Sequence, residues 1–273
     1  MTDNKILIPV DFSYAADKAI EFGVMLAKQL RGSITLLHVF EDDILPFETC
    51  NSDLERFARQ INEDTGIQAD FICEKGDIFS LIPFYAAKQQ FRMVVIATHG
   101  RKGLRQKFFG ADIIKLLKKI PKPTLVVQEH SQVPSMGFTK AVFAVGGHDS
   151  YDKKIDAMIL VAGLFNMEIH LYSISKPGYE QTDKLRENIK LAEHRFSQKG
   201  LEFKRVVEDQ QVFSVGFSKQ TLKYASASGA DLIAIMVNPT RENYYFADSD
   251  KEAILTNEKG IAVLSVSNAN ASI

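Results

Sequence analysis

In this chain, residues 94–103 read Val94-Val95-Ile96-Ala97-Thr98-His99-Gly100-Arg101-Lys102-Gly103, and Phe108-Phe109-Gly110-Ala111-Asp112 follow shortly afterwards. The apolar run at the start is typical of a buried parallel strand, and it ends in a basic loop that contains glycines. A helical pattern begins beyond the loop, at residues 113–117. Such a turn can hold a phosphate, because small residues let backbone N–H groups approach an anion and the next helix adds its own. Two glycines in a strand-to-helix turn are common, so the loop alone does not decide the function.

The order of elements around this stretch occurs twice in the chain. Each copy reads as strand, amphipathic helix and strand, over residues 5–10, 14–30 and 33–39 and again over residues 141–145, 151–165 and 168–172. Ile6 matches Ala141 and Ile34 matches Ile169 without a gap. Both copies continue with a long helix, a strand (69–74; 202–208), a short helix, a buried strand (93–97; 231–236), and a last helix and strand (123–127; 261–266).

Strands that alternate with helices predict the α/β class, with a parallel sheet covered by helices on both faces. Two such units account for the whole length of 273 residues. We therefore predict two domains, residues 1–130 and residues 139–273, with the junction near residues 128–138.

Composition limits the partners of this chain. The 45% of apolar residues and 25% of charged residues are ordinary for a globular protein. Lys and Arg number 33 against 34 Asp and Glu, so no overall field attracts nucleic acid or an anionic membrane. The longest apolar run, residues 157–165, is too short to span a bilayer, and the N-terminus runs into a strand pattern without room for a signal peptide. We expect a soluble, cytoplasmic protein without nucleic-acid or membrane partners.

The two cysteines, Cys50 and Cys73, lie in different segments and do not have the spacing of metal ligands. We therefore expect neither a disulfide nor a metal site, and a reduced cytosolic setting fits best.

Several motifs together point to a known family. They are Pro9-Val10-Asp11-Phe12-Ser13, the strand that ends in His38-Val39, the segment Thr98-His99-Gly100-Arg101-Lys102-Gly103, and Lys122-Pro123-Thr124-Leu125-Val126-Val127. The chain resembles the universal stress protein (UspA-like) family, in a tandem form with two copies. The resemblance implies two open, parallel, five-stranded sheets flanked by helices, similar to Rossmann folds and to adenine nucleotide alpha hydrolases. It also implies a stress-response or regulatory role, with ATP or AMP bound in some members, Mg accompanying ATP, and no nucleotide in others.

The nucleotide-binding pattern of the family is only partly present. Its three glycines and its Ser or Thr fall on Ala97, Gly100, Gly110 and Ala111, so two of the four positions match. Ala111 lacks the hydroxyl that would donate to a phosphate, while the backbone N–H groups of Gly110, Ala111 and Asp112 remain. The carboxylate of Asp112 opposes an anion, and the basic residues of the loop, Arg101 among them, offset it. The resemblance thus implies weakened binding.

The adenine end of the site is better preserved. By resemblance, Asp11, after Pro9 and Val10, contacts the adenine and ribose side of the nucleotide, and the backbone of Val39 lies against the base. Asp11 together with Ser13 is also a typical cap of the helix that begins near Tyr14, and both roles are compatible. His99 could donate to a phosphate or be a solvated turn residue.

The second copy departs further from the family. Gly146 stands where the first copy has Asp11, and residues 237–242 contain no glycine. The segment Val145-Gly146-Gly147-His148-Asp149-Ser150 instead resembles the phosphate loop of ATP pyrophosphatases, which makes Gly146, Gly147, Asp149 and Ser150 candidates for a second anion site. The alternative, which we favour, is a glycine turn in which Asp149 or Ser150 caps the next helix.

Other features favour structural roles. His38 and His170 lie within apolar patterns and are expected in the core. The last strand of each copy leaves an apolar sheet edge, and in the family such edges pair between domains. A tandem chain can satisfy this pairing within one molecule or in a homodimer.

Three classes of function compete. The first, which we favour, is a cytosolic stress or regulatory protein whose shape or assembly responds to ATP or AMP in the first copy. The second is a nucleotide-free interaction module in which both sites are relics. The third and weakest is an ATP-hydrolysing enzyme that uses the glycine loop at Gly146, since no organised set of catalytic carboxylates is visible.

Overall fold

The computed structural model describes residues 4–40, 47–98, 111–175, 181–209, 217–238 and 248–270. The elements of the first half are β1 (Lys5–Pro9), α1 (Tyr14–Leu30), β2 (Ser33–Phe40), α2 (Phe47–Thr65), β3 (Ala69–Lys75), α3 (Ile78–Ala87), β4 (Phe91–Thr98), α4 (Ala111–Leu117) and β5 (Thr124–Gln128). Those of the second half are β6 (Lys140–Ala144), α5 (Asp152–Ala162), β7 (Glu168–Ser175), α6 (Asp183–Gln198), β8 (Phe203–Asp209), α7 (Phe217–Ser228), β9 (Leu232–Met236), α8 (Asp248–Leu255) and β10 (Ala262–Val266). Every strand and helix predicted from the sequence is present, with ends that differ by a few residues.

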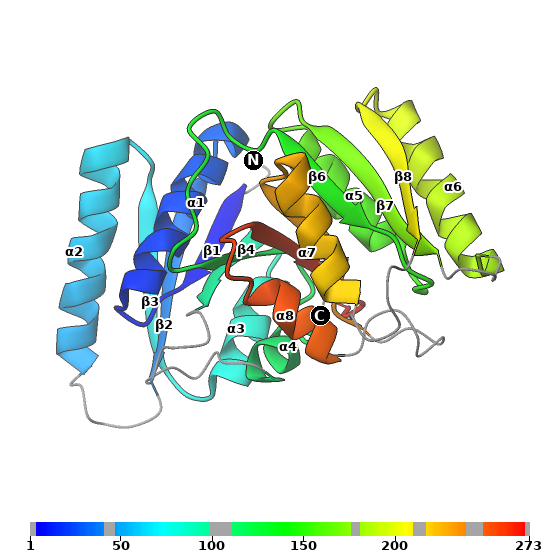
Figure 1. Ribbon diagram of the computed structural model, residues 1–273. Helices are drawn as coiled ribbons and strands as arrows, with labels where there is room; N and C mark the ends of the chain where they lie inside the picture. The colour runs from blue at the N-terminus through cyan, green and yellow to red at the C-terminus, as the bar shows by residue number, and fades with distance from the viewer. Residues whose placement is uncertain are drawn as a thin grey trace.

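The strands of both halves form one ten-stranded sheet in the order β3-β2-β1-β4-β5-β10-β9-β6-β7-β8 (Figure 1). The strand order of the first half is repeated in reverse in the second half, as the sequence repeat requires. Neighbouring strands within each half are parallel, for instance β1 with β2 and β6 with β7. The predicted α/β class is confirmed.

The two halves meet where β5 and β10 pair antiparallel. The partners are Val126 with Val263, Leu125 with Leu264, and Thr124 with Ser265, and all six residues are buried. Each final strand therefore covers the apolar edge of the other within one chain, which is one of the two arrangements expected from the sequence.

Helices cover both faces of this sheet, and each face carries one core that runs through both halves. One core joins side chains of α1, α2, α5 and α6 to the strands, with Phe22, Phe143 and Phe196 among its largest members. The other joins α3, α4, α7 and α8 to the opposite face. His38 and His170 are buried, as expected from the apolar patterns around them.

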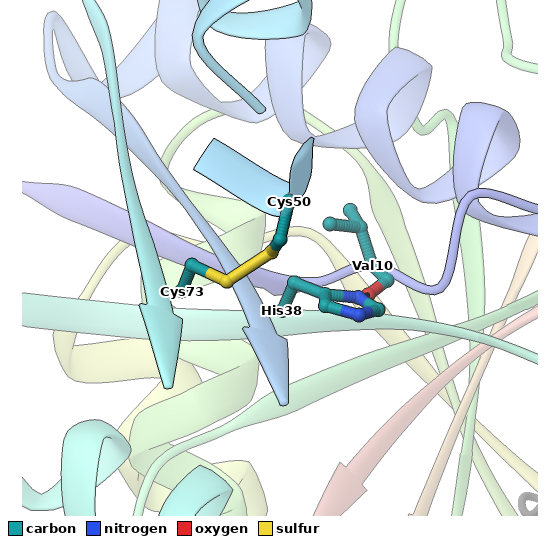
Figure 2. Close-up of a disulfide and its surroundings, with 4 residues drawn as sticks. All are labelled: Val10, His38, Cys50 and Cys73. Atoms are coloured by element: carbon teal, nitrogen blue, oxygen red, sulfur yellow. Dashed lines mark hydrogen bonds between the residues drawn. A yellow bond between two sulfur atoms is a disulfide. The ribbon is translucent and has the colours of Figure 1, made fainter. Parts of the chain in front are cut away.

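The cysteines are bonded, contrary to the expectation from their spacing. Cys50 in α2 and Cys73 in β3 form a disulfide, with their Cα atoms 6.6 Å apart (Figure 2). The pairing arises because α2 packs on the face of the sheet to which Cys73 points, and Cys50 lies on the buried side of α2 with Leu54 and Ile61. The bridge thus ties α2 to the outer strand of the first half.

A buried amide strengthens the junction of the halves. Gln128, at the end of β5, donates from Nε2 to the carbonyl of Leu255 in α8 at 2.8 Å and accepts at Oε1 from the Ser131 hydroxyl at 3.0 Å. Gln128 and Ser131 are completely buried. Because these groups have no access to water, removing the amide leaves polar atoms unpaired.

We therefore expect Gln128→Leu to lower the free energy of unfolding by about 1–3 kcal/mol. Urea denaturation of the full chain measures this loss. Gln198→Leu, at an exposed position at the end of α6, is the matched control and should change stability far less. Equal losses in the two variants would contradict a role for Gln128 at the junction.

Candidate functional site

The candidate site of the first half lies at the carboxyl ends of β1 and β4. β1 pairs with β2 on one side and with β4 on the other, so the chain leaves β1 at the point where the strand order reverses. Open α/β sheets bind ligands at such points, because the loops diverge there and leave a crevice. The structure brings five of the predicted site residues to this edge of the sheet, namely Pro9, Val10, Asp11, Val39 and Ala97.

Asp11 is exposed, and it also supports the start of α1. Its Oδ1 accepts hydrogen bonds from the backbone N–H of Ser13 at 3.2 Å and from the Ser13 hydroxyl at 2.5 Å. Ser13 is the N-cap residue of α1 and accepts from the N–H of Ala16. The expected capping role is confirmed, with Ser13 as the cap and Asp11 holding it.

Aromatic side chains fill the space behind Asp11. The Nδ1 of His38 lies 2.8 Å from the carbonyl oxygen of Val10 (Figure 2), and the rings of His38 and Phe12 are centred 4.7 Å apart. Phe57 of α2 lies against Phe12 at 5.9 Å. A hollow of about 10 Å³ lies beside Phe12 and Phe57, between them and α1, and it has the space of one water molecule. This hollow is too small for a nucleotide base.

The structure describes only some of the other predicted site residues. Val39 is half-buried and packs with the core on the α3 side of the sheet. Ala111 is the first residue of α4, and Asp112 is exposed in its first turn. His99, Gly100, Arg101 and Gly110 lie outside the described residues. Their roles stay predictions.

In the second half, the Gly146-Gly147 turn follows β6. Gly146, Gly147 and His148 are buried, while Asp149 and Ser150 are exposed. Asn188 of α6 fixes the turn, because its Nδ2 donates to the carbonyl oxygens of Gly146 at 2.8 Å and of His148 at 2.9 Å.

The favoured alternative for this turn, a helix cap by Asp149 or Ser150, is wrong. α5 begins at Asp152, its N-cap residue is Tyr151, and no side chain caps it. Ser150 has a φ of 53°, a left-handed conformation that is unusual for a residue with a side chain. The turn therefore has a conformation that capping does not explain.

Three basic side chains near this turn were missed by sequence reasoning. Lys154 of α5 and Lys251 of α8 are completely buried, and His148 is 3% exposed. The Nζ of Lys154 donates to the carbonyl oxygen of Ala144 and lies 4.2 Å from the centre of the Phe143 ring.

Burial sets the pKa of each of these groups. It lowers the pKa of Lys154 well below the usual value. It lowers the pKa of Lys251 as well, against the attraction of Asp248. Burial, together with repulsion by both lysines, lowers the pKa of His148 to about 3. The imidazole is therefore neutral at physiological pH.

One signal in the sequence could have revealed Lys154. The buried positions of α5 recur at helical spacing, and Lys154 lies on that side of the helix beside Ile155 and before Met158 and Val161. A lysine at a core position of an amphipathic helix is unusual, because a charged group there needs compensation. Lys251 had no comparable signal, since its helix is short.

Two further observations concern the described part of the chain. No three His, Cys, Asp or Glu side chains within it are grouped so that they could hold a metal ion. None of its helices has the length and apolar character needed to cross a membrane.

The sheet topology defines a Rossmann-like α/β protein, and the candidate site of the first half lies at its strand ends. Residues 4–128 match the family model described as the Universal stress protein family. Universal stress protein YxiE of Bacillus subtilis (strain 168) is 23% identical over 46% of this chain and 99% of that protein. The first half thus belongs to the universal stress protein family, and the second half repeats its fold in tandem.

Solved structures show that the tandem arrangement occurs elsewhere. A universal stress protein from Archaeoglobus fulgidus DSM 4304 is similar over 99% of this chain and 98% of its own, with a TM-score of 0.71 and 18% identity. A putative universal stress protein from Pseudomonas aeruginosa UCBPP-PA14 is similar over 97% and 93%, with a TM-score of 0.63 and 15% identity. At these identities the similarity establishes the fold of the whole chain.

Proposed function

We propose that this protein is a regulatory universal stress protein that binds ATP, with Mg, or AMP weakly in its first half. The proposed domains are residues 1–130, which carry the nucleotide site, and residues 139–273, in which the family pattern is lost. Asp11 and the backbone of Val39 would hold the adenosine, and the loop from Ala97 to Asp112 would hold the phosphates.

One observation carries this proposal. Asp11, with an exposed carboxylate, follows β1, and Ala97 lies near the end of the neighbouring strand β4, at the point where the strand order reverses. A ribose hydroxyl or a base amine can donate to such a carboxylate while the phosphates extend along the loop after β4.

The first test uses the full chain and isothermal titration calorimetry with AMP. We expect Asp11→Asn to raise the Kd about tenfold, because a hydrogen bond to a charged group contributes about 1.5–3 kcal/mol. Asp64→Asn, at an exposed position in α2, is the control and should leave the Kd unchanged. The proposal fails if native mass spectrometry of fresh protein retains no nucleotide and millimolar ATP leaves the Tm unmoved.

A second test restores the missing hydroxyl. By the family resemblance, a hydroxyl at position 111 would donate to a phosphate oxygen, so Ala111→Ser should tighten ATP binding about tenfold. Adenosine is the control ligand, since it has no phosphate, and its Kd should be the same for both proteins. Tighter adenosine binding, or no gain with ATP, would show that position 111 does not face the phosphates.

A nucleotide-free interaction module is the second candidate, and Ala97 and Ala111 favour it, since they replace a glycine and a hydroxyl of the family pattern. The titrations above separate the two. ATP hydrolysis at the Gly146 turn is the weakest candidate, since the described residues contain no group of carboxylates that could hold a metal ion.

A cytoplasmic location remains our proposal. The Cys50–Cys73 disulfide counts against it, because disulfides are unusual in the reducing cytosol. Thiol quantification in protein from freshly lysed cells under alkylating conditions measures the redox state directly.

A further inference from the structure

The carboxyl ends of β6 and β9 carry two buried amines. Lys154 donates from Nζ to the carbonyl oxygen of Ala144, the last residue of β6. Lys251 donates from Nζ to the carbonyl oxygen of Asn238, two residues beyond the end of β9, at 3.2 Å. β6 and β9 are neighbouring strands, and β6 has β7 on its other side, so this is the point of strand reversal in the second half. Ligands of open α/β sheets bind at such points.

The charges of these amines are unequally compensated. Lys251 forms an ion pair with Asp248 at 3.3 Å, and the same carboxylate pairs with Lys118 of α4 at 2.8 Å. For Lys154, no carboxylate of the described residues lies within ion-pair distance, and its other neighbours are the rings of Phe143 and Tyr151. A fully buried amine without a counter-charge is costly when it is protonated. Among the described residues, Lys154 thus lacks a negatively charged partner, whereas Lys251 has one.

The Gly146-Gly147 turn presents further unused donors. The Nδ1 of His148 is buried and has no hydrogen-bond partner. The backbone N–H groups of Gly146 and Gly147 donate to no acceptor in the described ranges. Asn188 engages only carbonyl oxygens of the turn, those of Gly146 and His148. Buried N–H groups are almost always paired, and consecutive free N–H groups in a glycine turn form a nest for an anion.

Both lysines act on this turn. The charges of Lys154 and Lys251 each contribute to lowering the pKa of His148, after burial. A neutral imidazole can donate one hydrogen bond from Nδ1. Solvent reaches the neighbouring residues, since Asp149 and Ser150 are exposed. The buried donors of the turn thus directly precede exposed residues in the chain.

We propose that the second half binds an oxyanion of the phosphate class, held by Lys154, Lys251, the Nδ1–H of His148 and the N–H groups of Gly146 and Gly147. The anion supplies the negative counter-charge that Lys154 lacks, and its oxygens accept hydrogen bonds from the unused donors of the turn. Of the site expected from the sequence, Gly146 and Gly147 remain, and the exposed side chains of Asp149 and Ser150 are replaced by the three basic groups.

The test is isothermal titration calorimetry of the full chain with inorganic phosphate, in a buffer free of other oxyanions. We expect saturable binding to the native protein and a Kd at least tenfold higher in Lys154→Met and in Lys251→Met, because each loses an amine that is a charged donor when the anion is bound. Lys190→Met, at an exposed position in α6, should bind as the native chain does. The two test variants lie in different helices, so misfolding of one, seen by circular dichroism, leaves the other informative.

Absence of saturable binding to the native chain would overturn the proposal, and so would native affinity in the folded lysine variants. Competition between AMP and inorganic phosphate in Asp11→Asn would identify a phosphoryl group of a nucleotide as a ligand, and lack of competition would indicate free phosphate. Adenosine binding that depends on Asp11, together with no phosphate binding, would refute only this second site and leave the first-half proposal standing.

Discussion

Removing the Cys50–Cys73 bridge is expected to lower the free energy of unfolding by about 3 kcal/mol. The two cysteines are 23 residues apart, and breaking the bond frees the unfolded chain to explore many more conformations. For a chain of this size the loss corresponds to a Tm lower by roughly 6–12 °C. Calorimetry of the protein with and without a reducing agent measures it.

The double variant Cys50→Ala/Cys73→Ala is the matched control for the reducing agent. It should melt near the temperature of the reduced native chain, and a reducing agent should not shift it further. Should the reducing agent leave the native Tm unchanged, the two thiols are not bonded in the purified protein. Equal melting of the double variant and the oxidised chain would show that the bridge adds no stability.

The bridge also bears on the first-half site. Cys73 of β3 lies opposite His38 of β2 in the sheet register, and His38 lies against the carbonyl of Val10 next to Asp11 (Figure 2). The helix held by the bridge carries Phe57, which packs on Phe12. Loosening α2 would therefore disturb the wall behind Asp11, and weaker AMP binding after reduction is the expected consequence.

The fold was largely predictable because its signals are local and repeated. The apolar alternation of residues 5–10 and the helical spacing of residues 14–30 recur in the second copy, and the structure has β1, α1, β6 and α5 there. The pairing of β5 with β10 was one of two open alternatives, since an apolar edge does not specify which strand covers it.

The disulfide was not predictable from spacing, because it depends on tertiary contact. Cys50 becomes close to Cys73 only when α2 lies on the same sheet face as the odd-numbered residues of β3. A search for buried positions would have helped, since Cys50 recurs with Leu54 at helical spacing and Cys73 alternates with Phe71.

The basic residues of the second-half site also depend on tertiary contact and were not predictable from sequence spacing. The glycine turn after β6 was recognised from the sequence, but the lysines that surround it come from α5 and α8, about a hundred residues apart in the chain. Their convergence follows from the position of β9 beside β6. Capping of α5 was expected because Asp and Ser commonly cap helices, and the structure instead begins this helix at Asp152.

The largest change in pH dependence is expected for Lys154→Met in phosphate-free buffer. Burial holds the pKa of Lys154 in the folded protein well below its usual value of 10.5. Between these two values the unfolded chain binds one more proton than the folded chain, so stability rises with pH, by up to about 1.4 kcal/mol per pH unit. Methionine has a similar volume and no charge, so the variant should lose this contribution and be more stable near pH 7, by about 1–4 kcal/mol.

Urea denaturation at several pH values below 10.5 measures both effects. In Lys154→Met the free energy of unfolding should still rise with pH in part, because burial also lowers the pKa of Lys251. Tyr151, the other titratable neighbour on α5, has its pKa raised by burial and so titrates at higher pH. The pKa of His148 is about 3, so its titration affects stability only in acid. Lys190→Met should keep the native dependence of stability on pH, and an unchanged dependence in Lys154→Met would show that Lys154 stays protonated in the folded chain.

Added phosphate should stabilise the native protein more than Lys154→Met, because the anion binds the protonated amine. This difference would link the stability of the second half to its proposed ligand.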